Sequence, residues 1–111
     1  MNAEEYLPLT ETSFFILLSL ATSPKHGYGI LKEVESFSAG RVILAAGTLY
    51  SALRRMLEDG WIERWEDEDS NDEKRERKLY GLTELGRRIF NLETERLRGL
   101  VRLTTRLSER H

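Results

Sequence analysis

The C-terminal quarter of this 111-residue chain places the strongest constraint on its fold. From Glu84 to about Ser108, apolar residues recur close to the seven-residue spacing of a helix seam, with an interruption at Arg96. One small domain cannot cover a helix of about two dozen residues on its own, so a second copy of the chain is the economical partner. The main stripe comprises Leu85, Ile89, Leu92, Leu100, Leu103 and Leu107, with Phe90, Leu97 and Val101 beside it.

We therefore expect a homodimer in which this helix packs against a partner subunit. The first helix, which is apolar nearly all round, is the natural surface for the partner to meet. The alternative is a helix that packs within its own chain and frays at its end. The residues predicted to form the dimer interface are Phe14, Leu18, Leu92, Leu97, Leu100, Val101, Leu103 and Leu107.

Size and composition predict one small cytoplasmic domain. Charged residues make up 32% of the chain and hydrophobic residues 40%, as in ordinary globular proteins. Cysteine is absent, which excludes disulfides and thiolate metal sites. The longest apolar run, 14–18, is too short to span a bilayer, and the N-terminus is acidic where a signal peptide needs positive charge. We expect no membrane partner.

The predicted elements follow one another in an informative order. Helices are expected over Leu9–Thr22, Tyr28–Phe37 and Ala46–Glu58, with a short strand at Arg41–Leu44 and Gly60 just past the end of the third helix. A hairpin with arms Trp61–Trp65 and Arg77–Leu82 encloses an acidic loop at 66–73, and Leu79 or Tyr80 marks its core side. Thr83 then caps the last helix.

This order indicates a fold that is mainly α with a small β-hairpin, a winged helix-turn-helix. We expect a DNA-binding domain over residues 1–83 and a dimerisation helix over 84–111. In such folds the third helix enters the major groove of double-stranded DNA, and the hairpin, or wing, reaches an adjacent groove or the backbone. Winged helices also serve as protein-interaction modules, so the order of elements alone does not distinguish DNA binding from protein binding.

The third helix has two contrasting faces. Leu49, Leu53, Met56 and Leu57 form one apolar face, and Thr48, Ser51, Arg54 and Arg55 lie opposite, with Tyr50 at the margin. Hydroxyl and guanidinium groups on an outward face suit phosphate and base contacts. The alternatives are a half-buried spacer for Tyr50, a capping role for Thr48, and pairing of Arg54 or Arg55 with Glu58 or Asp59 on the same helix. Which arginine reads bases stays open.

Four motifs resemble the PadR family of bacterial transcriptional regulators, and the resemblance covers nearly the whole chain. They are HGYGI at 26–30, GTLY at 47–50, LEDGWI at 57–62 and RERKLYGLTELG at 75–86. The resemblance implies a homodimeric repressor on a pseudo-palindromic operator, often released by a small aromatic or drug-like effector. The single C-terminal helix is similar to the shorter branch of the family.

Two departures from the family pattern affect the DNA site. Ala45 and Ala46 stand where many members carry a hydroxyl residue and proline, so the third helix lacks a side-chain N-cap. The wing tip is acidic, so contacts between the wing and DNA are left to the basic residues Arg75, Arg77 and Lys78. The alternative is that these three residues are only solubilising charges. The predicted DNA-binding set is Tyr28, Gly47, Thr48, Tyr50, Ser51, Arg54, Arg55, Arg75, Arg77 and Lys78.

Trp61, Trp65 and Phe90 are the candidates for stacking on an effector. Trp61 follows the helix-ending glycine at a position that usually belongs to the core, so packing is favoured for it. The last helix has no tryptophan, which removes an obvious stacking partner. We expect no catalysis, metal or cofactor, because His26 and His111 are far apart and no phosphate-binding glycine loop is present.

A winged-helix interaction module without DNA binding is the competing function. The net charge of −2 and the acidic wing tip favour it. However, the charge is unevenly distributed along the chain. The net charges of residues 1–40, 41–65, 66–83 and 84–111 are −3, +1, −3 and +3. The basic face of the third helix and the arm at 74–78 favour DNA. A continuous positive face across the dimer would decide for DNA.

Overall fold

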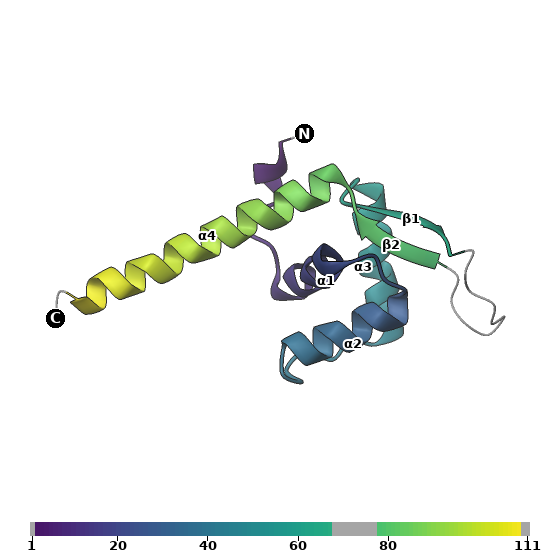
Figure 1. Cartoon of the computed structure of the whole chain (residues 1–111), viewed down its shortest axis with the longest axis horizontal. Coiled ribbons are helices and arrows are strands. Elements are labelled where there is room, and N and C mark those ends of the chain that lie inside the picture. Colours follow the sequence, from purple (N-terminus) through teal and green to yellow (C-terminus); the bar gives the residue numbers. More distant parts are fainter. Residues whose placement is uncertain (1, 68–77, 110–111) are drawn as a thin grey trace.

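A helical layer carries a small wing on one side and a long projecting helix on the other (Figure 1). The computed structural model describes residues 2–67 and 78–109, the last without its side chain. The elements are η1 (Ala3–Tyr6), α1 (Glu11–Thr22), α2 (Gly27–Phe37), α3 (Ala46–Glu58), β1 (Ile62–Glu66), β2 (Lys78–Leu82) and α4 (Glu84–Glu109). The predicted mainly α fold with a β-hairpin is therefore confirmed.

The N-terminal segment differs from the sequence prediction. The short 3₁₀ helix η1 was not predicted, and α1 begins at Glu11 rather than at Leu9. Thr10 ends the segment as the N-cap, because its Oγ1 accepts a hydrogen bond from the Ser13 N–H at 3.1 Å. The Leu9 N–H is taken up by a contact outside the helix, a hydrogen bond of 2.9 Å to Glu93 Oε2 on α4.

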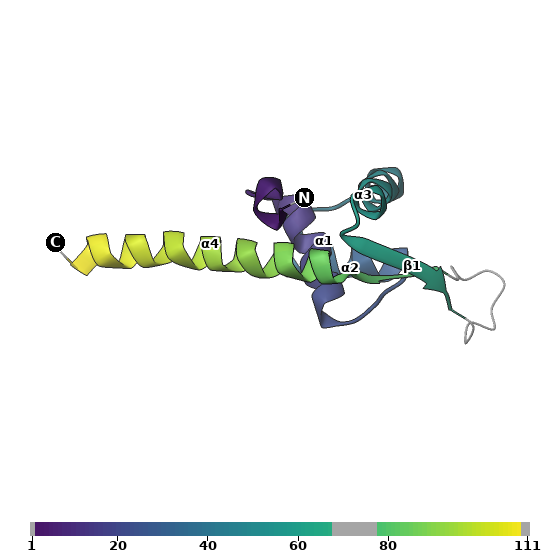
Figure 2. The same cartoon turned by 90° about the horizontal axis from the view of Figure 1, so that it is seen from above.

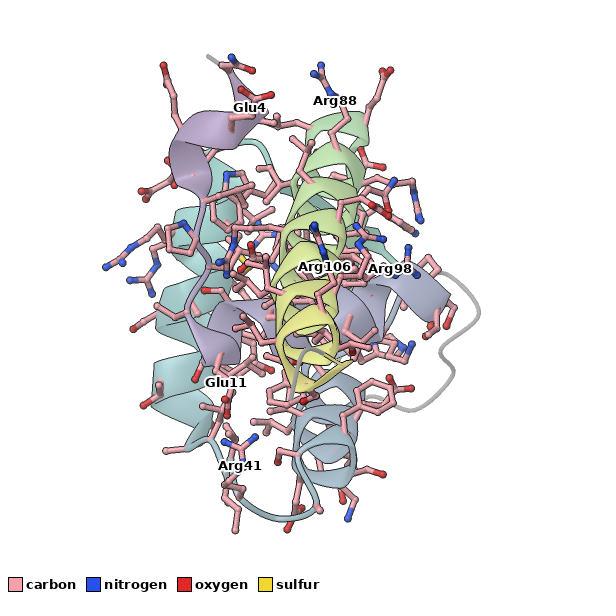
Figure 3. All side chains as sticks on the ribbon, turned by 90° about the vertical axis from the view of Figure 1, so that its left-hand side faces the viewer. Glu4, Glu11, Arg41, Arg88, Arg98 and Arg106 are labelled. Atoms are coloured by element: carbon pink, nitrogen blue, oxygen red, sulfur yellow. The ribbon has the colours of Figure 1, made fainter. Side chains whose placement is uncertain are left out.

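The expected strand at Arg41–Leu44 is wrong, since residues 42–45 have no regular structure. The chain turns sharply at Ala39 and Gly40, which have φ values of 54° and 79°. Ser38 Oγ then accepts from the Val42 N–H at 2.9 Å, and its single proton faces the carbonyls of Glu35 at 3.2 Å and Val42 at 3.3 Å. These backbone groups are thus unavailable for a β-ladder. Arg41 pairs with Glu11 at the start of α1, and Figure 3 shows the two side chains facing each other.

The wing is an antiparallel pair with Ile62 opposite Leu82 and Arg64 opposite Tyr80. Tyr80 is the residue that marks the core side, because it is buried whereas Leu79 is half-buried. The backbone of Lys25, just before α2, forms a bridge to Tyr80 with N···O distances of 3.0 and 2.9 Å. The base of the wing is therefore joined directly to the helical layer.

The core lies between α1, α2, α3 and the start of α4, and Ile30 and Val34 of α2 are fully buried in it. Ile16 and Leu17 of α1, Leu49 and Leu53 of α3, and Ile89 of α4 are fully or almost fully buried. The two helix boundaries near the wing follow the sequence prediction. Gly60 has a φ of 79° after α3, and Thr83 Oγ1 accepts from the Gly86 N–H at 3.1 Å at the start of α4.

A buried carboxylate ties the N-terminal segment to α4. Glu93 is 2% exposed, and it accepts hydrogen bonds from Arg96 at 2.5 and 3.0 Å as well as from the Leu9 N–H. The bonds from Arg96, helped by that from Leu9, hold the pKa of Glu93 below its ordinary value against the opposing effect of burial. A lowered pKa in the folded state means that Glu93 stabilises the fold at neutral pH.

We expect Glu93→Gln to lower the free energy of unfolding at pH 7 by about 2 kcal/mol, because an amide has one acceptor oxygen where the carboxylate has two and its NH₂ would face an N–H donor of Arg96. The difference from wild type should shrink as the pH falls through the lowered pKa, where wild-type Glu93 is itself protonated. Urea unfolding at pH 7 and at acid pH measures both effects. Glu95→Gln, which alters an exposed pair with Arg98, is the matched control. Equal effects of the two variants at pH 7 would contradict the prediction.

Candidate nucleic-acid interface

The exposed face of α3 follows from the spacing of its buried residues. Leu49 and Leu53 turn inward, so Gly47, Ser51 and Arg54 lie in line on the opposite side, and all three are exposed. Figure 2 views α3 close to its axis and shows it at the margin of the molecule. Arg54 and Arg55 lie on either side of the outward direction of this face, so the helical spacing alone does not choose between them.

Arg55 and Thr48 flank this line on one side. Arg55 is exposed, and it lines a shallow pocket that the N-terminal segment forms with α3 and in which Thr10 and Asp59 take part. Arg55 thus faces the N-terminal segment of the same chain. The arrangement separates two arginines that the sequence left equivalent.

The N-terminus of α3 carries no side-chain cap. Its N-cap is Ala45, and Ala46, Gly47 and Thr48 are exposed. A Cβ built at Gly47 would meet no atom within 4 Å, so packing inside the chain does not require glycine there. Uncapped N–H groups at a helix N-terminus attract anions such as phosphate, and a missing side chain allows close approach.

The other residues predicted for DNA contact occupy different environments. Tyr28 is 66% exposed at the start of α2, with Lys32 Nζ 5.6 Å from its ring centroid. Tyr50 is half-buried and packs against the core, so its ring has a packing role whatever else it does. Lys78 begins β2 and is half-buried. Arg75 and Arg77 lie outside the described residues, as does most of the acidic loop.

His26 is a residue of this region whose role the sequence did not reveal. It is the N-cap residue of α2, and its ring nitrogens reach the first residue of β2 and the residue directly after β1. Nδ1 is 2.9 Å from the Lys78 carbonyl oxygen, and Nε2 is 2.9 Å from Asp67 Oδ2. These partners are 52 and 41 residues away along the chain, so no local pattern could have indicated them.

The two halves of α4 are covered to different degrees. The first half packs on η1, α1 and β2, whereas residues 100–108 are all exposed. Figure 1 shows this second half extending beyond the rest of the chain, which explains a radius of gyration of 16.0 Å where a compact chain of this length has ~13 Å. The large apolar side chains left exposed there are Leu100 (48%), Val101 (62%), Leu103 (51%) and Leu107 (59%).

The remaining interface candidates are partly used inside the chain. Leu18, Leu92 and Leu97 are half-buried, and Phe14 stacks on Phe90 with ring centroids 5.5 Å apart. Seen along α4 in Figure 3, the Arg98 side chain lies to one side of the helix and Arg106 lies on its surface. The second half of α4 therefore combines an uncovered apolar surface with basic side chains.

A family model for the PadR-like transcriptional regulators matches residues 16–92, more than half of the chain. The chain belongs to this family. The matched residues run from α1 through the wing into the first half of α4. PadR-family transcription regulators are DNA-binding regulators and not enzymes. No curated protein shows significant similarity to the chain.

Solved structures agree with this assignment at the level of the fold. A PadR family regulator from Clostridium difficile superimposes with a TM-score of 0.71 at 22% identity, over 88% of this chain and 98% of its own. A PadR-like regulator from Bacillus cereus gives 0.67 at 20% identity, over 89% and 91%. Bacillus subtilis PadR in complex with operator DNA gives 0.60 at 22% identity, over 71% of this chain but only 44% of its own.

The aromatic residues predicted to stack on an effector of this PadR-like chain lie mostly in its core. Trp61 is 8% exposed and meets Tyr6 edge to face at 4.9 Å, and Phe90 is covered by Phe14. Trp65 is 40% exposed, and a Cβ at Gly81 would come within 2.9 Å of its ring. Trp65 is thus the candidate ring that a ligand can reach most readily.

Across the described part of the chain, no three histidine, aspartate or glutamate side chains are grouped to hold a metal ion. No described helix has the length and hydropathy needed to cross a bilayer.

Proposed function

We propose that the chain is a homodimeric PadR-like repressor that binds a pseudo-palindromic operator through α3 and the wing. The observation that carries this proposal is the exposed face of α3. Gly47, Ser51 and Arg54 are in line on the side opposite the core, beside a helix N-terminus without a side-chain cap. In this arrangement, backbone N–H groups meet phosphate while the side chain at 54 reaches base edges.

The uncovered half of α4 supports the homodimer. Four large apolar side chains on residues 100–107 are about half exposed or more, and a second α4 or the apolar α1 of a partner would cover them. A two-fold dimer presents two copies of α3. Separated by about one turn of DNA, ~34 Å, they match the two half-sites of a palindromic operator.

Within this site we assign base reading to Arg54. Arg54→Ala should weaken specific operator binding by roughly 10- to 100-fold, the loss expected for one bidentate guanine contact. Arg55→Ala, one residue further along α3, is the matched control. It should weaken specific and nonspecific binding by similar factors, and both losses should be smaller than the loss of specific binding in Arg54→Ala. Fluorescence anisotropy with operator and with scrambled DNA measures both. A larger loss of specificity in Arg55→Ala would reverse the assignment.

Release of DNA by a small aromatic or drug-like effector is proposed from the family resemblance. The accessible ring of Trp65 is the feature that supports it. The wing residues Arg75 and Arg77 are kept as proposed DNA contacts on the same basis, together with Lys78.

A winged-helix module that binds protein rather than DNA is the second candidate. The observation in its favour is the net charge of −2, because most DNA-binding domains are basic. Such a module would use the same outward face of α3 without phosphate contacts, and its binding would depend little on salt.

The deciding experiment is a titration of the protein against the DNA upstream of its own gene at several salt concentrations, with unrelated DNA as competitor. A specific complex should lose affinity linearly on a log–log plot, with a slope near −0.9 per phosphate neutralised. Absence of any complex at low salt would reject the DNA proposal for the unliganded protein and favour the interaction module.

A further inference from the structure

His26 joins the helix-turn-helix to both strands of the wing at once. Its backbone begins α2, its Nδ1 contacts the carbonyl of Lys78, the first residue of β2, and its Nε2 contacts Asp67, the residue directly after β1. Both N···O distances are 2.9 Å. We call these three groups, the His26 ring, the Lys78 carbonyl and the Asp67 carboxylate, the wing clamp.

The chemistry of the two partners fixes the protonation that the clamp requires. A carbonyl oxygen only accepts hydrogen bonds, and so does an ionised carboxylate. A neutral imidazole has one N–H and can donate to only one of them, whereas an imidazolium donates to both. The complete clamp therefore needs a proton on each ring nitrogen of His26.

We propose that His26 is a positioning residue that holds the wing against the helix-turn-helix only while its ring is doubly protonated, so that DNA affinity falls as the pH rises through the histidine range. The proposal rests on the DNA-binding function proposed above. A wing held in one position loses less conformational freedom on binding DNA than a wing that has lost one of its two anchors. Histidine is the side chain whose charge ordinarily changes between pH 5 and 8.

The charged groups around the clamp leave Asp67 as the direct partner of the ring. On the helical side, Lys25 Nζ is directed at the end of α1, 2.6 Å from the Ser19 carbonyl and 2.6 Å from Thr22 Oγ1, and 3.4 Å from Glu33. On the wing side, among the described residues, the ring contacts the carboxylate of Asp67 and the backbone carbonyl of Lys78, and the charged side chains of β1, Glu63, Arg64 and Glu66, are exposed. The backbone bridge between Lys25 and Tyr80 does not titrate and keeps the base of β2 in place at any pH.

Two substitutions separate the clamp from the simple charge of the ring. In Asp67→Asn, the amide can turn its NH₂ toward the ring and donate to Nε2 while Nδ1–H donates to Lys78, so the neutral ring completes the clamp. If the positive charge of His26 acted only by attracting phosphate, Asp67→Asn would keep the pH dependence. His26→Gln removes the titrating ring and retains His111, so it reports any contribution from the other histidine.

DNA affinity is measured at constant ionic strength at pH 5.5 and pH 8.5, with the fragment from upstream of the gene as the probe. Wild-type affinity should fall roughly three- to tenfold between the two pH values, the size of effect expected for the net contribution of one hydrogen bond. Asp67→Asn should bind at both pH values about as tightly as wild type at pH 5.5, and His26→Gln should bind weakly at both. Full pH dependence in Asp67→Asn would overturn the clamp.

A second measurement needs no DNA, so it tests the wing clamp separately from the proposed DNA-binding function. Nitrogen-15 NMR of the ring should show both His26 nitrogens protonated in the free protein at pH 5.5 and one of them deprotonated at pH 8.5. In Asp67→Asn, the neutral ring should keep its remaining proton on Nδ1. A ring with only one proton at pH 5.5 overturns the clamp. Failure of wild type to bind DNA at every pH, with a doubly protonated ring, would reject the proposed function and leave the clamp supported.

Discussion

Gly86→Ala is expected to destabilise the chain by about 3 kcal/mol or more. Gly86 lies in the first turn of α4, against the backbone of Trp61 in the connection between α3 and β1. A Cβ at this position would come within 1.9 Å of the Trp61 carbonyl oxygen and 2.9 Å of its carbon, both backbone atoms that cannot rotate away. The start of α4 would have to move, which separates Ile89 from the core and breaks the cap at Thr83.

The same helix provides the control. Gly99→Ala adds the same methyl group in the exposed half of α4, where no atom lies within 4 Å of the new Cβ. Alanine is favoured over glycine in a helix by about 1 kcal/mol, so this variant should be as stable as wild type or slightly more stable. Thermal melts at equal protein concentration compare them. A Gly86→Ala melting temperature within a degree or two of wild type would show that α4 does not cross Trp61 as closely as described.

Leu100→Asp combined with Leu103→Asp is expected to convert the proposed dimer into a monomer. Both side chains are about half exposed in the single chain, so aspartate there costs the monomer little. In a dimer the same positions would bury two unpaired carboxylates per subunit, which is prohibitive without a cationic partner. Multi-angle light scattering should give the mass of one chain, 12.9 kDa, for the variant and twice that for wild type.

Asn91→Asp combined with Thr105→Asp is the matched control, because it changes the net charge equally on exposed positions outside the apolar stripe. This control should remain dimeric. Melting curves should show a folded core in both variants, since all four substituted positions are exposed and Ile89 is unchanged. A persistent dimer in the Leu100 and Leu103 variant would place the interface elsewhere, and a monomeric wild type would reject the dimer altogether.

The parts of the fold that follow from short-range patterns could be predicted from the sequence. The bounds of α3, the stop at Gly60 and the cap at Thr83 depend on residues within one or two helical turns, and all three are observed. The start of α1 was predicted two residues too early, because the sequence did not show that Thr10 caps the helix and that the Leu9 N–H is bound by Glu93. The β-branched run at 41–44 favoured a strand, but the Ser38 hydroxyl contacts both backbone polar groups of Val42.

The candidate DNA site shows the same division. Helical periodicity identified the outward face of α3, and it could not distinguish Arg54 from Arg55 because both lie on that face. The distinction required the N-terminal segment, which meets Arg55 at the pocket, whereas Arg54 does not line that pocket. For Tyr50 the structure adds a packing role, while its contact with DNA stays a prediction.

By itself, the sequence determined the order of the helices and the hairpin, the family, and an apolar stripe along α4 that is longer than one small domain can cover. These properties are periodic or local, and they depend on backbone preferences that neighbouring residues set. Only the tertiary structure decided that Glu93 is bound by Leu9, that Gly86 must lack a side chain, and that His26 joins both strands of the wing. Each of these contacts joins residues that are distant along the chain, so its partners are chosen by the packing of whole elements and leave no pattern in the sequence nearby.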